Sequence, residues 1–422
     1  MEYKITDVKE GIKLHTINTD KFKTNIIAVF LTTPINRENV TYNAVLSSVL
    51  RRGTKTMPTQ EQISKELEEI YGASFDCGLD KTGDNHIIKF YLESINDNFL
   101  PQNEDNMLKI AIEKLSDIVC NPLIENGGFK EEYITQEKEN IRQIIESKKD
   151  NKAQYAMARC IEEIYKDKPY GLYKYGYVED LDKINAQNLY KYYQKLLNEC
   201  KIDIFVSGKL TENINEYIIE NENIKRLSPR MPIYNKPILE KKETKNPNTI
   251  IESMDVTQGK LIIGLDVSLK EEKEKYYALM YNSILGGTAN SKLFQNVREK
   301  ESLAYVASSS YLRYKSNIFI NCGIEIKNYE KALNKIKEQL EDMKNGSFTE
   351  EDIANSKKVI ISTIKSIDDE QDTEITYFLG QELTENKTTL EEYIQEVENV
   401  TKDNIIDVAN RININTIYFL RD

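Results

Sequence analysis

The chain has 422 residues, a formal net charge of -12, and 57 Lys and Arg against 69 Asp and Glu. The length predicts two to four domains, and the acidic balance argues against nucleic acid as a partner, because phosphate binding needs clustered Lys and Arg on a basic face. No apolar window approaches the ~20 residues of a membrane span, and no targeting segment opens the chain. We therefore expect a cytoplasmic protein without membrane contact.

The first half begins with strands, continues with helices and ends with a strand. Apolar patterning predicts strands at residues 3–16, 24–33, 74–79, 86–93 and 201–206. Helical spacing and breaker residues predict helices at about 42–52, 60–71, 107–119, 131–149, 153–165 and 187–197. The second of these helices should begin with a capping box formed by Thr59 and Gln62.

The same pattern starts again after a proline-rich segment. Residues 226–249 hold four of the nine prolines with little periodicity, which predicts an extended linker. Residues 44–54 then align without a gap on residues 278–288, at an offset of 234. We therefore predict an α+β protein of two homologous domains, residues 1–225 and 250–422, each a mostly antiparallel sheet covered by helices on one face.

The second copy contains a stretch with the character of a site. A glycine pair, Gly286-Gly287, ends one helix, and Ser291 is placed to cap the next. Arg298 should lie on the last turn of that second helix, and Tyr305 should begin the strand that follows. The two side chains therefore flank one helix-to-strand turn and could converge on one pocket.

Residues 285–305 closely resemble a segment of the insulinase/pitrilysin family of zinc peptidases, with its Gly-Gly, Leu-Phe, Arg-Glu-Lys and Leu-Ala-Tyr elements in order. The repeat matches the short, two-domain members of this family, so the resemblance covers essentially the whole chain. It implies that Arg298 and Tyr305 bind a peptide backbone and help to stabilise the transition state. It also implies substrate contacts at Gly286, Gly287, Asn290 and Phe294.

The resemblance also shows where zinc ligands should be. Active members carry His-x-x-Glu-His on the first helix of the first half, and here those three positions hold Ala44, Ser47 and Ser48. The third ligand, a Glu on a later helix, falls on Ile144, although a two-residue slip would give Glu146. The chain has only two histidines, His15 and His86, both in predicted strands, so no helical His pair exists. We expect no zinc site in this chain.

A chain with the substrate segment but without the metal fits one subunit of a heterodimer. The resemblance implies a homologous zinc-bearing partner, peptide substrates, and a chamber shared by the two chains, with Arg298 and Tyr305 acting at the partner's zinc. Two alternatives remain: a structural subunit without a catalytic role, and a homodimeric peptide-binding protein. The substrate, the partner's identity and the pathway are not encoded in recognisable residues.

Overall fold

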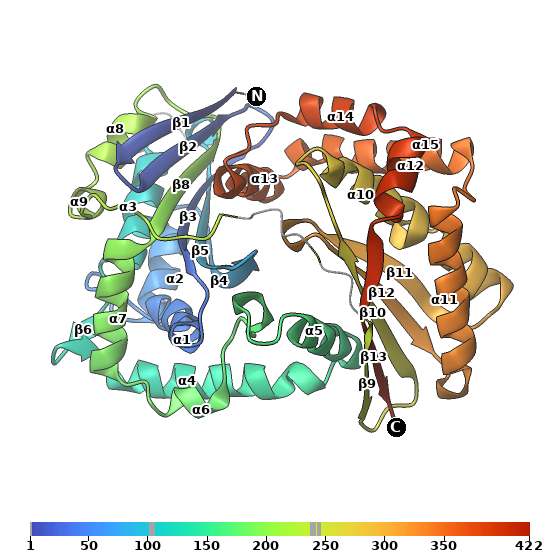
Figure 1. The fold of residues 1–422 in the computed structure, drawn as a ribbon. Helices are drawn as coiled ribbons and strands as arrows, with labels where there is room; N and C mark the ends of the chain where they lie inside the picture. Colours follow the sequence, from blue (N-terminus) through green and yellow to red (C-terminus); the bar gives the residue numbers. More distant parts are fainter. Residues whose placement is uncertain (1, 101–105, 237–241, 243–245) are drawn as a thin grey trace. The chain divides into compact units, whose positions relative to one another are not determined.

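The computed structural model describes residues 2–100, 106–236, 242 and 246–422 (Figure 1). The chain divides into two compact units, each with its own sheet and helices. Unit 1 comprises Met1–Glu146, Leu172–Lys236 and Glu370–Gly380. Unit 2 comprises Ser147–Gly171, Pro237–Asp369 and Gln381–Asp422.

Unit 1 contains a six-stranded sheet in the order β1-β2-β8-β3-β5-β4. Its strands are β1 (Glu2–Lys9), β2 (Ile12–Asn18), β3 (Thr24–Pro34), β4 (Ser74–Thr82), β5 (Asn85–Ile95) and β8 (Lys201–Gly208). All neighbouring strands are antiparallel except β2 and β8. The apolar run of β3 lies between β8 and β5, as expected for a strand with both faces buried.

Helices cover one face of this sheet around a large apolar core. They are α1 (Val40–Leu50), α2 (Gln60–Glu69), α3 (Met107–Cys120), α4 (Glu131–Glu146), α6 (Val178–Leu181), α7 (Ala186–Glu199), α8 (Ile214–Ile219) and α9 (Glu222–Lys225). A small hairpin, β6 (Ile124–Glu125) and β7 (Gly128–Phe129), lies between α3 and α4 in sequence. The predicted capping box is present: the Thr59 hydroxyl accepts from the Gln62 N–H.

Unit 2 contains a five-stranded sheet in the order β11-β12-β10-β13-β9. Its strands are β9 (Asn248–Ser253), β10 (Gly259–Val267), β11 (Ala304–Leu312), β12 (Asn317–Ile324) and β13 (Ile412–Arg421). Only β9 and β13 are parallel. The helices of this half of the chain are α10 (Glu274–Asn282), α11 (Tyr329–Lys344), α12 (Glu350–Lys365), α13 (Gln371–Thr384), α14 (Leu390–Glu398) and α15 (Lys402–Ala409).

The two sheets share one topology. Read from its β4 end, the first sheet places β4, β5, β3, β8 and β2 where the second places β11, β12, β10, β13 and β9. The single parallel pair also recurs at the equivalent place. Helices α1 and α10 begin at Val40 and Glu274, which differ by the offset of 234 seen in the sequence. The predicted α+β class and internal repeat are confirmed.

The units differ from the predicted domain boundaries by an exchange of helices. Helix α5 (Lys152–Ile164) follows the first-half helices in sequence, yet it belongs to unit 2, where it contacts β10 and β13. The first ten residues of α13 belong to unit 1, where Phe378 stacks on Tyr3 of β1 with ring centroids 3.8 Å apart. Each sheet thus has a helix on its second face, which corrects the expectation of helices on one face only.

Two further sequence predictions need correction. Residues 3–16 form a hairpin of β1 and β2 rather than one strand, because Gly11 turns the chain with φ +76°, a conformation that glycine adopts readily. The predicted linker is also structured over its first part: Arg230 is buried, and its N–H donates to Glu10 O. Residues 237–241 and 243–245 of that linker lie outside the described residues.

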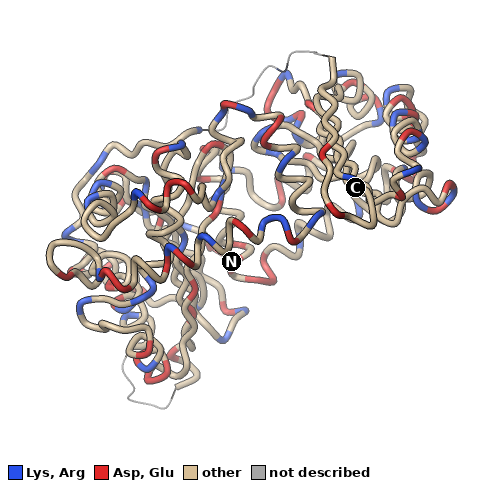
Figure 2. The backbone as a smooth tube through the Cα atoms, turned by 90° about the horizontal axis from the view of Figure 1, so that it is seen from below, with Lys and Arg blue, Asp and Glu red and all other residues tan. Residues whose placement is uncertain are grey.

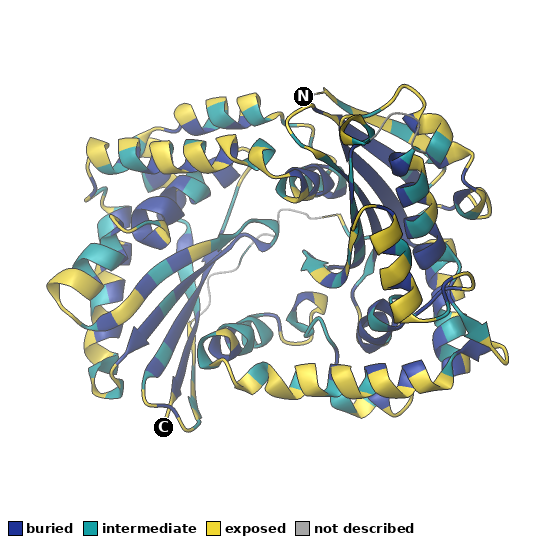
Figure 3. Ribbon diagram, turned by 180° about the vertical axis from the view of Figure 1, so that it is seen from behind, coloured by how far each residue is buried: buried dark blue, intermediate teal, exposed yellow. Residues whose placement is uncertain are grey.

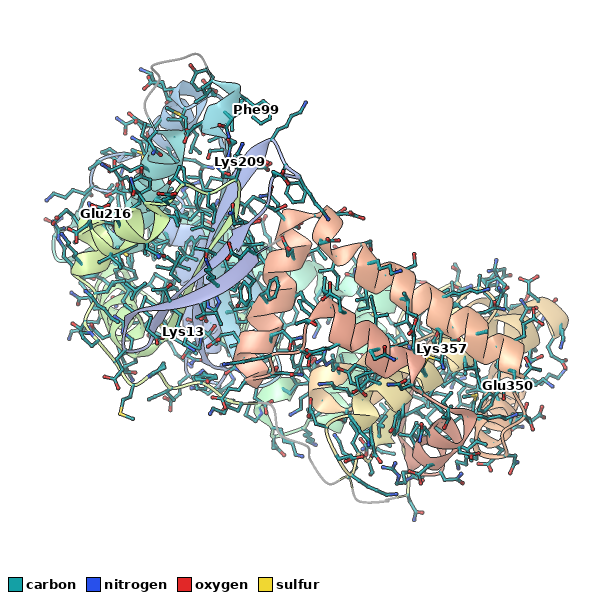
Figure 4. All side chains as sticks on the ribbon, turned by 90° about the horizontal axis from the view of Figure 1, so that it is seen from above. Lys13, Phe99, Lys209, Glu216, Glu350 and Lys357 are labelled. Atoms are coloured by element: carbon teal, nitrogen blue, oxygen red, sulfur yellow. The ribbon has the colours of Figure 1, made fainter. Side chains whose placement is uncertain are left out.

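The surface is charged and mixed in sign. Basic and acidic residues are interspersed over both units (Figure 2). Helix α4, which contains several of them, is largely exposed on one side (Figure 3). Glu350 and Lys357, for example, both lie on α12 (Figure 4), where the Lys357 ammonium donates to Glu398 O over 2.6 Å. No helix within the described ranges is long and apolar enough to cross a bilayer.

A carboxylate on β9 anchors the exchanged helix α5. Glu252 accepts hydrogen bonds from the Tyr155 hydroxyl at 2.6 Å, the Tyr418 hydroxyl at 2.8 Å and Arg159 Nε at 3.3 Å. Burial alone would raise the pKa of Glu252, but these three donors hold that pKa below its ordinary value. Glu252 is therefore ionised at neutral pH and ties two residues of α5 to the sheet.

We predict that Glu252→Gln lowers the free energy of unfolding by about 2 kcal/mol at pH 7, because charge-assisted hydrogen bonds are lost. Because the folded-state pKa is lowered, this contribution is complete at neutral pH, begins to decrease below the ordinary glutamate pKa, and is lost as the pH falls through the lowered folded-state pKa. Urea unfolding at pH 7 and at pH 3 to 4 measures both effects. The control is Glu338→Gln, in an exposed pair with Lys335, and an equal loss in both variants would contradict the prediction.

Candidate functional site

The helices of the resemblance segment are irregular. Helix α10 continues directly into a π-helical segment, η4 (Ser283–Gly287), and a second one, η5 (Phe294–Lys300), follows after a short loop. In a π-helix each N–H bonds to the fifth preceding carbonyl instead of the fourth, and such turns occur frequently at functional sites. Their counterparts in unit 1, α1 and α2, are ordinary α-helices.

The two glycines of the pair differ in how closely the rest of the chain approaches them. A Cβ on Gly286 would lie 2.6 Å from both the backbone N and the hydroxyl of Ser309 on β11. Glycine at this position therefore lets η4 pack directly against β11. Gly287 is exposed, and a Cβ there would lie 3.2 Å from Asn282 O and 3.3 Å from Asn282 Nδ2, which are longer contacts. The substrate contacts predicted for both glycines stay predictions.

Arg298 lies on η5, near its end, as the sequence predicted. Its guanidinium carbon stands 4.5 Å from the ring centroid of Phe294, a cation–π arrangement. Its Nε lies 3.6 Å from a carboxylate oxygen of Glu299, and 42% of the side chain is exposed. The planar group is thus supported on one side by an aromatic ring and remains accessible to a ligand.

Tyr305 begins β11 at a β-bulge. The ladder to β12 pairs Ala304 with Ile324 and Val306 with Gly323, so Tyr305 is the extra residue. Bulges redirect side chains and occur often beside active sites. Tyr305 is 64% exposed, which is unusual for a tyrosine in a strand. The equivalent strand β4 pairs with β5 without a bulge.

The other predicted residues lie around these two. Asn290 is exposed in the loop before η5, and Phe294 is half-buried beneath Arg298. Ser291 does not cap the helix as predicted: its hydroxyl is buried, and it has no hydrogen-bond partner among the described residues. Elements η5 and β11 are in contact, so the structure brings Arg298, Phe294 and Tyr305 to one region of unit 2.

The degenerate metal positions lie on α1 in unit 1. Ala44 is fully buried in the core, and Ser47 is 6% exposed. The hydroxyls of Ser47 and Ser48 both donate to Ala44 O, at 2.9 and 3.4 Å. These serines are satisfied within their own helix, so α1 is an ordinary core helix.

Helix α4 carries the position predicted for the third ligand. Ile144 is 37% exposed, whereas Glu137 is 5% exposed. Glu137 lies 3.4 Å from Arg52 Nε, just after α1, and accepts from Asn140 Nδ2 at 3.0 Å. An arginine therefore neutralises the buried carboxylate between α1 and α4, a pairing that the sequence did not suggest.

Both histidines are buried in strands. His15 Nε2 lies 3.0 Å from Asp203 Oδ1, and His15 Nδ1 lies 2.8 Å from the Tyr3 hydroxyl. His86 Nδ1 lies 3.0 Å from Asn43 Nδ2, and burial lowers the pKa of His86 to about 3. In the parts of the chain that the structure describes, no three His, Cys, Asp or Glu side chains form a possible metal-binding cluster.

Comparison with known proteins agrees with this fold. The family described as "Peptidase M16 inactive domain" matches residues 183–360. A protein named "Probable inactive metalloprotease YmfF" of Bacillus subtilis is 35% identical over 97% of this chain and 96% of its own length. A solved structure of a conserved protein from Enterococcus faecalis superposes with a TM-score of 0.92 at 29% identity, covering 100% of this chain and 99% of that one.

A more distant structure, described as a peptidase M16 inactive domain from Pseudomonas fluorescens, superposes with a TM-score of 0.81 at 15% identity and shares the fold. It covers 100% of this chain and 98% of that one. The duplicated α+β architecture and the degenerate metal helix thus define a chain built like an M16 peptidase without its zinc motif. The chain belongs to the M16 family, the insulinase/pitrilysin peptidases, as a homologue of its inactive members.

We predict that the purified chain retains no stoichiometric zinc after dialysis, because the three motif positions offer no imidazole. Metal analysis of the dialysed protein measures this directly. One tightly bound zinc per chain would contradict the prediction and would direct the search to carboxylates on α4, namely Glu137, Glu139 and Glu146.

The two glycines provide a matched pair of substitutions. Gly286→Ala should cost about 1–3 kcal/mol of unfolding free energy, because its methyl group overlaps backbone atoms of β11. Gly287→Ala should cost clearly less, since its nearest contact is longer. Chemical denaturation of both variants tests this, and equal losses would show that η4 does not pack on β11 as described.

Proposed function

We propose that this chain is the non-zinc subunit of a heterodimeric zinc metallopeptidase of the cytoplasm. A homologous partner would carry the intact His-x-x-Glu-His helix, and this chain would contribute Arg298 and Tyr305 to a shared peptide site. The observation that best supports this proposal is the irregular backbone around these two residues. The π-helical segments and the bulge occur in the copy that carries the Arg–Tyr segment, whereas the equivalent α1, α2 and β4 are regular.

The two side chains are suited to different tasks. When a peptide carbonyl is attacked, negative charge grows on its oxygen, and the exposed Tyr305 hydroxyl could donate to that oxygen. One such donor contributes ~3 to 4 kcal/mol to transition-state stabilisation. Arg298 could hold a substrate carbonyl through its planar guanidinium, which Phe294 orients. The partner's zinc would supply Lewis-acid chemistry for hydrolysis.

A structural subunit is the second candidate, and one observation favours it. Gly286 is explained by its contact with Ser309 alone, so this part of the motif persists without any substrate. Packing does not account in the same way for Tyr305, which is 64% exposed. The two candidates therefore differ in the effect of changing exposed residues that do not support the fold.

We predict that Tyr305→Phe lowers kcat of the reconstituted heterodimer by ~10² with KM nearly unchanged, because the hydroxyl would act only in the transition state. The matched control is Tyr71→Phe, the same change at the equivalent exposed position of unit 1, which should leave kcat unaltered. Steady-state kinetics on an unstructured peptide measures both variants.

Arg298→Lys should raise KM as well as lower kcat, because the two-pronged guanidinium is lost while the charge remains. Both substitutions should leave the unfolding curve and the heterodimer intact. Less than a threefold loss of activity for both Tyr305→Phe and Arg298→Lys would reject the shared site and leave the structural role.

A further inference from the structure

Unit 1 contains a cavity whose lining includes none of the degenerate metal positions. It has a volume of about 350 Å³, at the lower end of the range for ligand pockets. Its apolar wall consists of Pro34 at the end of β3, Tyr42 on α1, Leu196 and Tyr192 on α7, and Ile233. The Tyr42 and Tyr192 rings meet at 46° with centroids 5.1 Å apart and form an aromatic corner.

The cavity is preformed. The Tyr192 hydroxyl donates to the buried Asn43 Oδ1 at 2.7 Å, which fixes the ring. On the opposite side, Asn36 N donates to Asn39 Oδ1 at 3.0 Å, and Asn39 Nδ2 donates to Pro34 O at 2.8 Å. Ile233 is held by its own N–H, which donates to Glu199 O at 3.3 Å. Little ordering would accompany binding of a ligand.

An apolar side chain of the cavity lining is exposed: Ile233 is 60% exposed. Met231, two residues before it in the chain, is 83% exposed. The lining also includes Glu38, and Glu199 with Lys195, whose Nζ lies 3.9 Å from a Glu199 carboxylate oxygen. The entrance is therefore apolar with an excess of negative charge.

The repeat shows that this cavity is not a requirement of the fold. The counterpart of Tyr42 in unit 2, at the offset of 234, is Tyr276. Tyr276 is 3% exposed, and the ring of Tyr393 covers it edge-on at 4.9 Å. The tyrosine at this helix position has an aromatic neighbour in both copies, but it is buried in unit 2 and only partly buried in unit 1.

We propose that this cavity is a docking site for a partner polypeptide, which inserts one large apolar side chain next to a basic residue. The aromatic corner and the volume suit a single anchor side chain, and interface hot spots are typically such side chains packed into a pocket. Exposed Met231 and Ile233 would pack beside the anchor, and Glu38 and Glu199 would attract the flanking positive charge. This inference is independent of the Arg–Tyr site.

The probe is the tripeptide N-acetyl-Lys-Phe-Lys-amide, titrated into the full chain with isoleucine methyl groups labelled for NMR. The Ile233 methyl should shift saturably with a millimolar dissociation constant, while the exposed Ile219 and Ile251 methyls stay unchanged. N-acetyl-Lys-Ala-Lys-amide tests the anchor, and N-acetyl-Glu-Phe-Glu-amide tests the charge. Each should bind at least about fivefold more weakly.

Substitutions at exposed positions complete the test, because they should not affect the stability of the fold. Ile233→Asp should weaken binding by about tenfold or more, whereas Ile219→Asp, on α8, should have no effect. The double change Glu38→Gln and Glu199→Gln should abolish the preference for the lysine peptide. An unmoved Ile233 methyl, equal binding of the alanine peptide, or equal effects of the two aspartate variants would each overturn the proposal.

Discussion

Each sheet has a second apolar face, opposite the helices of its own half of the sequence, and this face must be covered. The exchange of helices between the two halves follows from this constraint. Both sheets are apolar on both sides: Ile27 and Val29 face the first-half helices, while Ala28 and Phe30 between them are equally buried. A helix from the other half of the sequence covers each second face. In unit 2 that helix is α5, and its Tyr155, Ala156 and Cys160 complete a separate core with Tyr418 and Phe319.

Polar contacts fix the position and rotation of both exchanged helices, α5 and α13, on their sheets. Glu252 ties α5 to β9, and in unit 1 the Gln371 amide donates to Ser207 O at 3.0 Å. Apolar contact has no direction, so it would let a helix slide or rotate on a sheet. A charge-assisted bond has a definite geometry and selects one register. The duplicated fold therefore depends on a small number of polar contacts.

Much of this architecture could be predicted from the sequence, because periodicity and capping are local signals. The position of Arg298 on η5 and that of Tyr305 at the start of β11 followed from the apolar stripe and the strand pattern. The helix exchange could not be predicted, since the stripe of α5 shows that a face is buried but not which sheet buries it. The π-helical segments were missed because η4 has only 5 residues and η5 only 7, too few for a different hydrogen-bond period to be recognised in the apolar pattern.

The two copies differ in the regularity of the backbone at equivalent positions. In unit 1 the helix that would hold zinc has become a regular core helix, with its serines satisfied at Ala44 O and the buried Glu137 paired with Arg52. In unit 2 the equivalent elements contain π-helical turns, a bulge and the Ser291 hydroxyl, which has no hydrogen-bond partner among the residues that the structure describes. A buried unpaired hydroxyl costs about 1–3 kcal/mol. Packing alone does not require this irregular backbone, since the equivalent elements of unit 1 pack without it, so the proposed role of Arg298 and Tyr305 rests on this difference between the two copies.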